Sequence, residues 1–228
     1  MKIIVIPDIH GRIDKVQPFI DKIEEADIVI LAGDLTNGSL ETAINVLKVI
    51  SQHNSNILTI PGNMDTDKIV AYTDELGYNI HKTHRIIDGI AFVGMGGALP
   101  FAGFTEYTEQ QYSEMLSQID RTTADLPQVF VSHQPPLNTL NDRLYDGRQV
   151  GSQSIRDYIE TYQPLICFTG HIHEAVGIDT IGSTQICNPG AVWKGYATAE
   201  IVAGQVKSLN IHRLTQIKTP SRKHLMSV

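Results

Sequence analysis

Short apolar runs alternate with longer amphipathic stretches through the first third of the chain. Continuous β-branched runs predict buried strands at residues 3–6, 28–31 and 57–60. Between them, apolar side chains recur every three or four positions over residues 13–26 and 39–51, which predicts two helices. A third helix is expected from Asp65 or Thr66 to about residue 76. This strand–helix order predicts a parallel sheet with helices on its faces.

The second half of the chain is richer in predicted strand. Asp88-Gly89 is a turn signal between two apolar runs. Later strands are expected at residues 128–131, 165–169, 177–181, 184–187, 198–202 and 206–213, and helices at 108–119 and 152–162. Residues 135–150 form a polar loop of a length that is usually functional. The alternation also fits one doubly wound sheet, but the β-rich second half favours two packed mixed sheets. We expect a single domain over residues 1–218 and a mobile tail over 219–228.

Side chains that can bind metal follow five of the predicted strands. They occur as Asp8-x-His10, Gly33-Asp34, Gly62-Asn63, Ser132-His133 and Gly170-His171-x-His173. Strand ends meet at one edge of such a sheet, where ligands bind. A mixed set of carboxylates, an amide and imidazoles suits borderline divalent ions. The sequence therefore predicts two divalent metal ions that share one ligand, with Mn²⁺ favoured and Fe, Zn²⁺ or Ni²⁺ as alternatives.

Composition and charge limit the kinds of molecule that the protein is expected to bind. The 228-residue chain has a net charge of −7, which argues against binding a nucleic-acid polymer. A nucleotide substrate remains compatible, because bound metal supplies positive charge locally. The two cysteines lie in apolar runs and are expected as buried thiols. With no signal-like or bilayer-length apolar segment, we expect a cytoplasmic protein without a membrane partner. A homo-oligomer is compatible with the sequence.

In this order, the five motifs resemble those of the calcineurin-like metallophosphoesterases, over about residues 1–190. The resemblance implies a four-layer αββα sandwich of two mixed β-sheets flanked by helices. It implies that one ion is held by Asp8, His10, Asp34 and His173. The other would be held by Asp34, Asn63, His133 and His171, with Asp34 as the bridge.

The expected activity is that of a dinuclear metal-dependent phosphoesterase acting on a small or nucleotide-like phosphoester through a metal-bridging hydroxide. Asp34, Asn63 and His133 are the expected catalytic residues. Arg12 is a candidate for contacting the phosphate, beside Asn63 and His133.

The third motif departs from the family pattern. The family usually has a histidine where this chain has Met64, and that histidine is the candidate proton donor to the leaving group. A thioether cannot donate a proton, and a general acid typically contributes ~10²–10⁴-fold in rate. The enzyme would then prefer diesters with good leaving groups, or use His81 or His84 instead, or serve as a metal-binding scaffold without catalysis. Asp65 is left to cap the next helix.

Other candidates have a structural and a functional interpretation. The aromatic residues Phe101, Phe104 and Tyr107 could stack on a nucleobase, although packing of their loop is favoured. The glycine-rich stretch from residue 94 to 97 could bind an anion, but a tight turn is favoured. Glu174 could hold a ligand histidine through a hydrogen bond.

Overall fold

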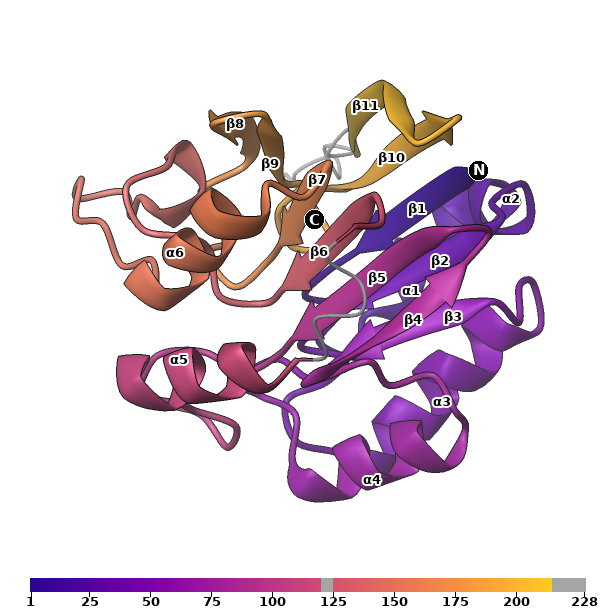
Figure 1. Ribbon diagram of the computed structural model, residues 1–228. Helices are drawn as coiled ribbons and strands as arrows, with labels where there is room; N and C mark the ends of the chain where they lie inside the picture. The colour runs from indigo at the N-terminus through magenta and orange to yellow at the C-terminus, as the bar shows by residue number, and fades with distance from the viewer. Residues whose placement is uncertain (120–124, 215–228) are drawn as a thin grey trace, which may run out of the picture.

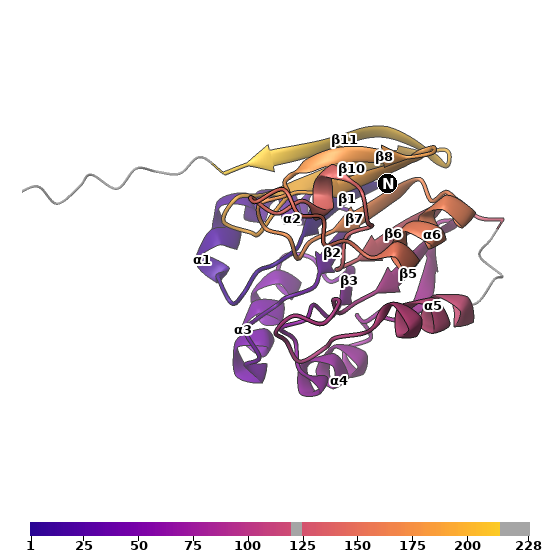
Figure 2. The same ribbon diagram turned by 90° about the vertical axis from the view of Figure 1, so that its left-hand side faces the viewer.

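Two mixed β-sheets pack face to face, with helices on both outer faces (Figure 1). The computed structural model describes residues 1–119 and 125–214. The expected tail over residues 219–228 lies outside the described residues. In the view turned by 90°, β10 and β11 lie along the top of the molecule, and α3 and α4 lie at the bottom (Figure 2).

The first sheet has five strands in the order β11-β10-β1-β2-β3. Its parallel centre consists of β1 (Lys2–Ile6), β2 (Ile28–Ala32) and β3 (Ile57–Ile60). The hairpin of β10 (Gly195–Val202) and β11 (Gln205–Arg213) adds to it, with β10 antiparallel to β1. The three parallel strands therefore end at one edge of this sheet.

The second sheet has six strands in the order β4-β5-β6-β7-β9-β8. The four central strands are parallel: β5 (Ile90–Met95), β6 (Gln128–Ser132), β7 (Ile166–Thr169) and β9 (Thr184–Asn188). The antiparallel edge strands are β4 (Thr83–Ile87) and β8 (Gly177–Ile181).

Helices cover each sheet on the face away from the other sheet. The first sheet is covered by α1 (Ile13–Val16), η1 (Gln17–Phe19), α2 (Ile20–Glu24), α3 (Leu40–Ser51) and α4 (Asp67–Glu75). The second is covered by α5 (Glu109–Gln118) and α6 (Gln153–Tyr162), and the short η3 (Leu140–Asp142) lies in the loop before α6. The hydroxyls of Ser39, Thr108 and Ser152 cap α3, α5 and α6.

The expected single helix over residues 13–26 is wrong. The chain forms α1, a 3-10 turn and α2 instead. Pro18 lies in the 3-10 turn, and its ring removes a backbone N–H and clashes with the preceding turn of an α-helix. The amphipathic spacing survives the break, because Val16, Phe19 and Ile23 are all buried.

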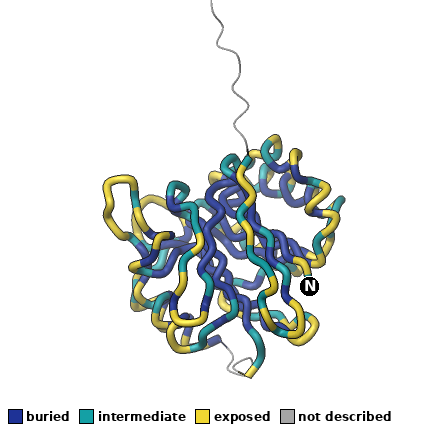
Figure 3. The backbone as a smooth tube through the Cα atoms, turned by 90° about the horizontal axis from the view of Figure 1, so that it is seen from above, coloured by how far each residue is buried: buried dark blue, intermediate teal, exposed yellow. Residues whose placement is uncertain are grey.

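The apolar residues form three layers, which accounts for the buried strands. Val5 and Ile30 face Phe92 and Val131 between the sheets, whereas Ile4 on the same strand as Val5 faces the helices. Buried segments occupy the middle of the molecule and exposed segments its periphery (Figure 3). The αββα sandwich is confirmed.

The two cysteines, Cys167 and Cys187, are buried free thiols, as expected. Within the described part of the chain, every helix is too short or too polar to cross a bilayer.

Candidate metal centre

The carboxyl ends of five strands bring the seven predicted ligands to one place. Asp8 and His10 follow β1, Asp34 follows β2, Asn63 follows β3, His133 follows β6, and His171 and His173 follow β7. Backbone hydrogen bonds join these loops: Asp8 N–H donates to Gly33 O at 3.0 Å, and His10 N–H to Asp34 O at 2.9 Å. The site therefore spans both sheets.

Several of these residues have a left-handed backbone. The φ angles of Asp8, His10, Asp34 and His171 are 51°, 48°, 52° and 65°. Residues with a Cβ rarely adopt this conformation, which costs about 1–3 kcal/mol each. The surrounding hydrogen bonds hold the loops in this shape, so the backbone turns each side chain inward before any ion binds.

The glycines of the motifs leave room for ligands from other motifs. A Cβ on Gly62 would collide with the carboxylate of Asp34, and a Cβ on Gly170 would come within 2.7 Å of Asp8 Oδ2. Real Cβ atoms do not approach other atoms so closely. The pairs Gly62-Asn63 and Gly170-His171 thus reflect close packing between loops.

The tautomer of His133 is fixed by a backbone carbonyl. Its Nδ1–H donates to Ala32 O at 2.9 Å, so Nε2 carries the lone pair. That lone pair faces Asn63 Oδ1 at 3.3 Å and Asp34 Oδ2 at 3.6 Å. Three acceptors converge, and only a cation or a proton between them would satisfy all three.

His10 is held in the same way on the other side of Asp34. Its Nδ1 lies 2.7 Å from Asn37 Oδ1, so Nε2 again carries the lone pair. Nε2 lies 3.5 Å from Asp34 Oδ2 and 3.2 Å from His173 Nε2, and the latter atom is 3.4 Å from Asp8 Oδ1. These donors also fit a cation.

The donor atoms form two groups. Asp8, His10 and His173 form one, and Asp8, Asp34 and His133 form the other, with the atoms of each group within 4.8 Å of one another. Asp34 Oδ2 lies within 3.6 Å of both His10 and His133. His171 belongs to neither group, but its ring centroid lies 5.2 Å from that of His133. The buried carboxylates and the imidazole lone pairs fit divalent metal ions.

The charges in the site are tightly linked. Burial would raise the pKa of Asp34, but His133, His10 and the Met64 N–H outweigh burial and lower it to about 2. Burial would lower the pKa of His133, but the Asp34 carboxylate outweighs burial and raises it to about 9. Burial, together with His133, lowers the pKa of His171 to about 4. A proton on His133 therefore competes with metal for the same lone pair.

The expectation that Asp65 caps the next helix is wrong. Thr66 is the N-cap residue of α4. The buried Asp65 carboxylate instead accepts hydrogen bonds from the N–H groups of Gly62, Leu35 and Thr36 at 2.9, 3.2 and 3.3 Å. It ties the loop of Asp34 to the loop of Asn63. Met64 is half-buried beside them and donates its backbone N–H to Asp34 Oδ1 at 2.7 Å.

Sequence reasoning missed two residues that support the ligands. Asn37 orients His10, and its place three residues after Asp34 was the available signal. Trp193 packs against both His10 and His173, with ring centroids 5.9 and 5.2 Å apart. Trp193 is the single tryptophan of the chain and follows the Asn188-Pro-Gly turn closely, which was a weak signal.

Arg12 lies on the exposed rim. Its guanidinium carbon is 5.9 Å from the centroid of the Trp193 ring, and its Nε is 3.3 Å from Asp14 Oδ1. Because Trp193 touches two predicted ligands, Arg12 stands beside the metal centre without being one of its ligands.

The contacts do not favour His81 or His84 as proton donors, or the glycine-rich stretch from residue 94 to 97 as an anion site. His81 Nδ1 accepts the Gly96 N–H at 2.8 Å, and its Nε2 is 3.1 Å from the Tyr107 hydroxyl, so both ring nitrogens are engaged. His84 lies on the edge strand β4. The Gly97 N–H is bonded to Pro61 O, so the amides of Gly96 and Gly97 are both used internally. Glu174 accepts the Tyr145 N–H at 3.4 Å.

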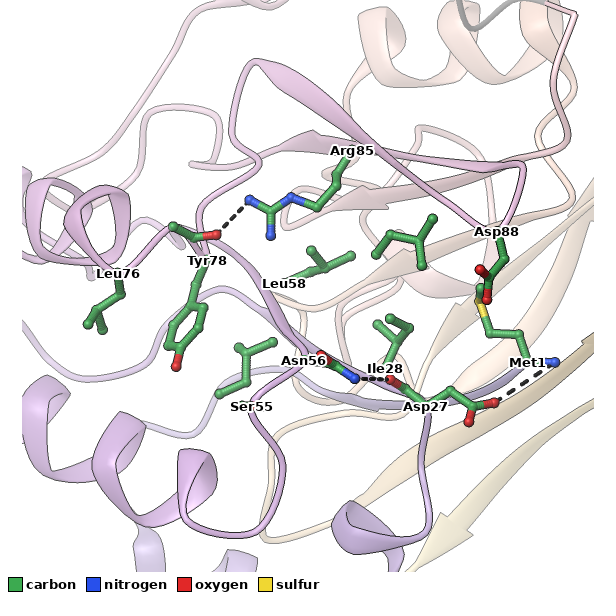
Figure 4. Close-up of a pocket in the computed structure, with 13 residues that line it drawn as sticks. Met1, Asp27, Ile28, Ser55, Asn56, Leu58, Leu76, Tyr78, Arg85 and Asp88 are labelled. Atoms are coloured by element: carbon green, nitrogen blue, oxygen red, sulfur yellow. Dashed lines mark hydrogen bonds and ion pairs between the residues drawn. The ribbon is translucent and has the colours of Figure 1, made fainter.

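A cavity of about 640 Å³ lies at the opposite end of the strands (Figure 4). Asp27 and Asn56, which precede β2 and β3, line it. Several of its polar groups are paired: Arg85 donates to Gly77 O, Asn56 donates to Asp27 O, and the Met1 amine lies 4.0 Å from Asp27 Oδ2. The seven predicted ligands take no part in this cavity.

Known proteins share this fold. A structure from Thermus thermophilus has a TM-score of 0.71 and 17% identity, covering 92% of this chain and 98% of that one. A dimetal phosphatase from Danio rerio has a TM-score of 0.63 and 13% identity, covering 89% of this chain and 93% of that one.

The sequence also has closer relatives. It is 37% identical to an uncharacterized protein of Methanocaldococcus jannaschii over 198 residues, which is 83% of this chain and 88% of that protein. The sequence model of the calcineurin-like phosphoesterases, a family of phosphoester hydrolases, matches residues 1–175. This range includes all seven predicted ligands, and the chain belongs to the calcineurin-like phosphoesterase family.

Proposed function

We propose that the chain is a dinuclear metal-dependent phosphodiesterase that acts on a small or nucleotide-like substrate. The observation that carries this proposal is the position of Asp34 Oδ2, which lies 3.5 Å from Nε2 of His10 and 3.6 Å from Nε2 of His133. One carboxylate thus adjoins a ligand of each predicted sub-site, as a bridging ligand must.

The two sub-sites would be those implied by the resemblance. Asp8, His10, Asp34 and His173 would hold one ion, and Asp34, Asn63, His133 and His171 the other. Bound divalent ions would lower the pKa of a water nucleophile and offset charge on the phosphoryl oxygens. Mn²⁺ is our first choice of ion, and the mixed donor set suits Fe and Zn²⁺ as well.

The chain's own residues orient the reaction. Asp34 is buried and held by the Met64 N–H, so its oxygen atoms are fixed, and the Asn63 oxygen adds a ligand without adding charge. Asn63 and His133 would face the phosphoryl group, and Arg12 on the rim is the proposed guanidinium contact to its oxygens. Met64 supplies no proton to the leaving group.

The preference for diesters follows from Met64. A leaving group of low pKa departs without protonation, so activated aryl diesters, including aryl esters of nucleotides, suit the site better than alkyl monoesters. We expect Mn²⁺-dependent hydrolysis of bis(4-nitrophenyl) phosphate and little hydrolysis of glycerol phosphate. Met64→His should raise the rate on poor leaving groups by up to ~10²-fold relative to good ones. An unchanged ratio would refute the assignment of the missing acid.

A scaffold without catalysis is the alternative, and the replacement of the proton donor by Met64 favours it. The test is turnover of the activated diester by the manganese-loaded chain beside Asp34→Asn, together with elemental analysis of bound metal. Turnover well above that of the variant supports the phosphodiesterase. Two bound ions with turnover equal to that of the variant would establish the scaffold instead.

A further inference from the structure

A cavity of about 580 Å³ opens directly beside the metal centre. His171, Ile172 and His173 line it. Leu99, Phe101 and the loop before α6, including Leu144 and Arg148, complete the lining. Small-molecule sites typically have volumes of about 300–1,000 Å³, so the cavity is large enough for a substrate group attached to phosphorus at the histidines.

Two polar side chains that line the cavity are already paired. Gln134 accepts the Leu99 N–H at 3.0 Å and donates to Val150 O at 2.8 Å, so its amide ties the loop of Leu99 to the loop before α6. Arg148 Nε is paired with Asp146 Oδ2 at 2.7 Å. The carboxylate of Glu174 is unfavourable for a second phosphate. Most of the surface left for an occupant is apolar, which suits an uncharged group.

Phe101 presents a free aromatic face on an anchored backbone. Its side chain is 90% exposed. Its N–H donates to Glu106 Oε1 at 3.0 Å, and the carbonyl of Asn63 accepts the Phe104 and Thr105 N–H groups at 2.7 and 3.1 Å. The loop that carries Phe101 is therefore tied to a predicted metal ligand. Tyr107, by contrast, is stacked on His81 and is not available.

We propose that this cavity binds a flat aromatic group of the phosphoester, an aryl ring or a nucleobase, which stacks on Phe101. The inference rests on the proposed function, since it places the phosphoryl group at the histidines of the metal centre. It adds the class of the substrate's organic part and the residue that recognises it. Stacking needs only an exposed ring face and therefore tolerates different rings.

The test uses three diesters with the same 4-nitrophenolate leaving group and a methyl, phenyl or thymidine 5′ group as the other ester. The manganese-loaded wild-type chain should favour the phenyl or thymidine ester over the methyl ester, chiefly through a lower KM. Phe101→Ala should reduce that preference about tenfold, the order expected for loss of one stacked ring, and should affect the methyl ester least, because its only ring is the leaving group that all three esters share. The phenyl and thymidine substrates distinguish the two sources of the ring.

Phe104→Ala is the matched control. Phe104 lies in the same loop and is 61% exposed, but it packs near Gly38 and does not line the cavity. Its replacement should leave the preference unchanged. Equal losses on the methyl and phenyl esters in Phe101→Ala, or the same effect in Phe104→Ala, would overturn the proposal.

A binding measurement separates this inference from the proposed function. Calorimetry of the manganese-loaded chain should give a lower Kd for phenylphosphonate than for methylphosphonate, by about tenfold in the wild type and not in Phe101→Ala. If no diester is hydrolysed, the proposed function fails, but that difference in Kd would still support the aromatic site. Equal Kd values in the wild type would refute it.

Discussion

Three of the predicted ligands depend on a neighbour that fixes their direction. Ala32 O sets the tautomer of His133, Asn37 orients His10, and the Met64 N–H holds Asp34. His133 and Ala32 are 101 positions apart in the chain. The sequence predicts the ligands themselves, because they follow recognisable strands. It does not predict such partners, since backbone carbonyls leave no signature in side-chain identity.

Gly62→Ala tests the close packing at Asp34. The added methyl group would collide with the Asp34 carboxylate and displace it, so we expect bound manganese to fall to one ion or none per chain. Elemental analysis after dialysis measures this. Gly177→Ala is the control, because its Cβ would meet only Asn141 Nδ2 at 4.0 Å. Full metal content in Gly62→Ala would show that the loop can shift to accommodate the methyl group without displacing Asp34.

His81 predicts a dependence of stability on pH. Burial, with Lys82 nearby, lowers its pKa from 6.5 to about 3. Between these values the unfolded chain binds the proton and the folded chain does not, so stability is full above pH 6.5 and falls as the pH drops below it. From pH 7 to pH 5 the wild type should lose about 2 kcal/mol more unfolding free energy than His81→Gln.

Urea unfolding at the two pH values measures the effect of His81. His212→Gln serves as the comparison, because His212 is exposed on β11. The same pH dependence in all three proteins would contradict a buried neutral role for His81.

At the scale of elements, most strands and helices are predictable from apolar spacing. The predicted strands at 3–6, 28–31 and 57–60 match β1, β2 and β3 to within a residue. The break in the helix over residues 13–26 does not follow from apolar spacing, because that spacing takes no account of the backbone N–H that Pro18 lacks. The exposure of Phe101 was also not predictable from the sequence, since loop contacts decide whether an aromatic side chain is packed or exposed to solvent.

The loop before α6 is organised by one buried carboxylate. Asp142 accepts the N–H groups of Asn138, Thr139 and Gly151 at 2.9, 3.1 and 3.2 Å. Asp142→Ala would leave these donors unpaired, so we expect a loss of about 1–3 kcal/mol in unfolding free energy. Amides of residues 138–151 should also exchange faster with solvent.

Urea unfolding and hydrogen exchange measure the effect of Asp142→Ala. Asp146→Ala is the control, since Asp146 lies in the same loop but is exposed and bonds chiefly to Arg148. Unchanged exchange in Asp142→Ala would show that the loop is held by other contacts.

On the scale of the whole molecule, the candidate metal centre joins the two sheets. Its predicted ligands follow three strands of the first sheet and two of the second. Ions that bind only the folded chain stabilise it, by ~2.7 kcal/mol at a free concentration of 100 times Kd. We therefore expect Mn²⁺ to raise the Tm of the wild type and EDTA to reverse the increase.

Asp34→Asn should lose most of this response in calorimetric melting curves, because the variant lacks the shared carboxylate. If Mn²⁺ raises the Tm of the variant as much as that of the wild type, the ions stabilise the protein by binding at a site that does not include Asp34.

The fluorescence of Trp193 can report metal binding at one of the two proposed sub-sites. The single indole lies against His10 and His173, the imidazoles of one proposed sub-site, while the rings of His133 and His171 lie 5.2 Å apart in the other. Its emission should therefore respond more strongly when a paramagnetic ion enters the first position than when the second fills. A fluorescence titration, set beside metal counting, would then reveal the order in which the pair is loaded.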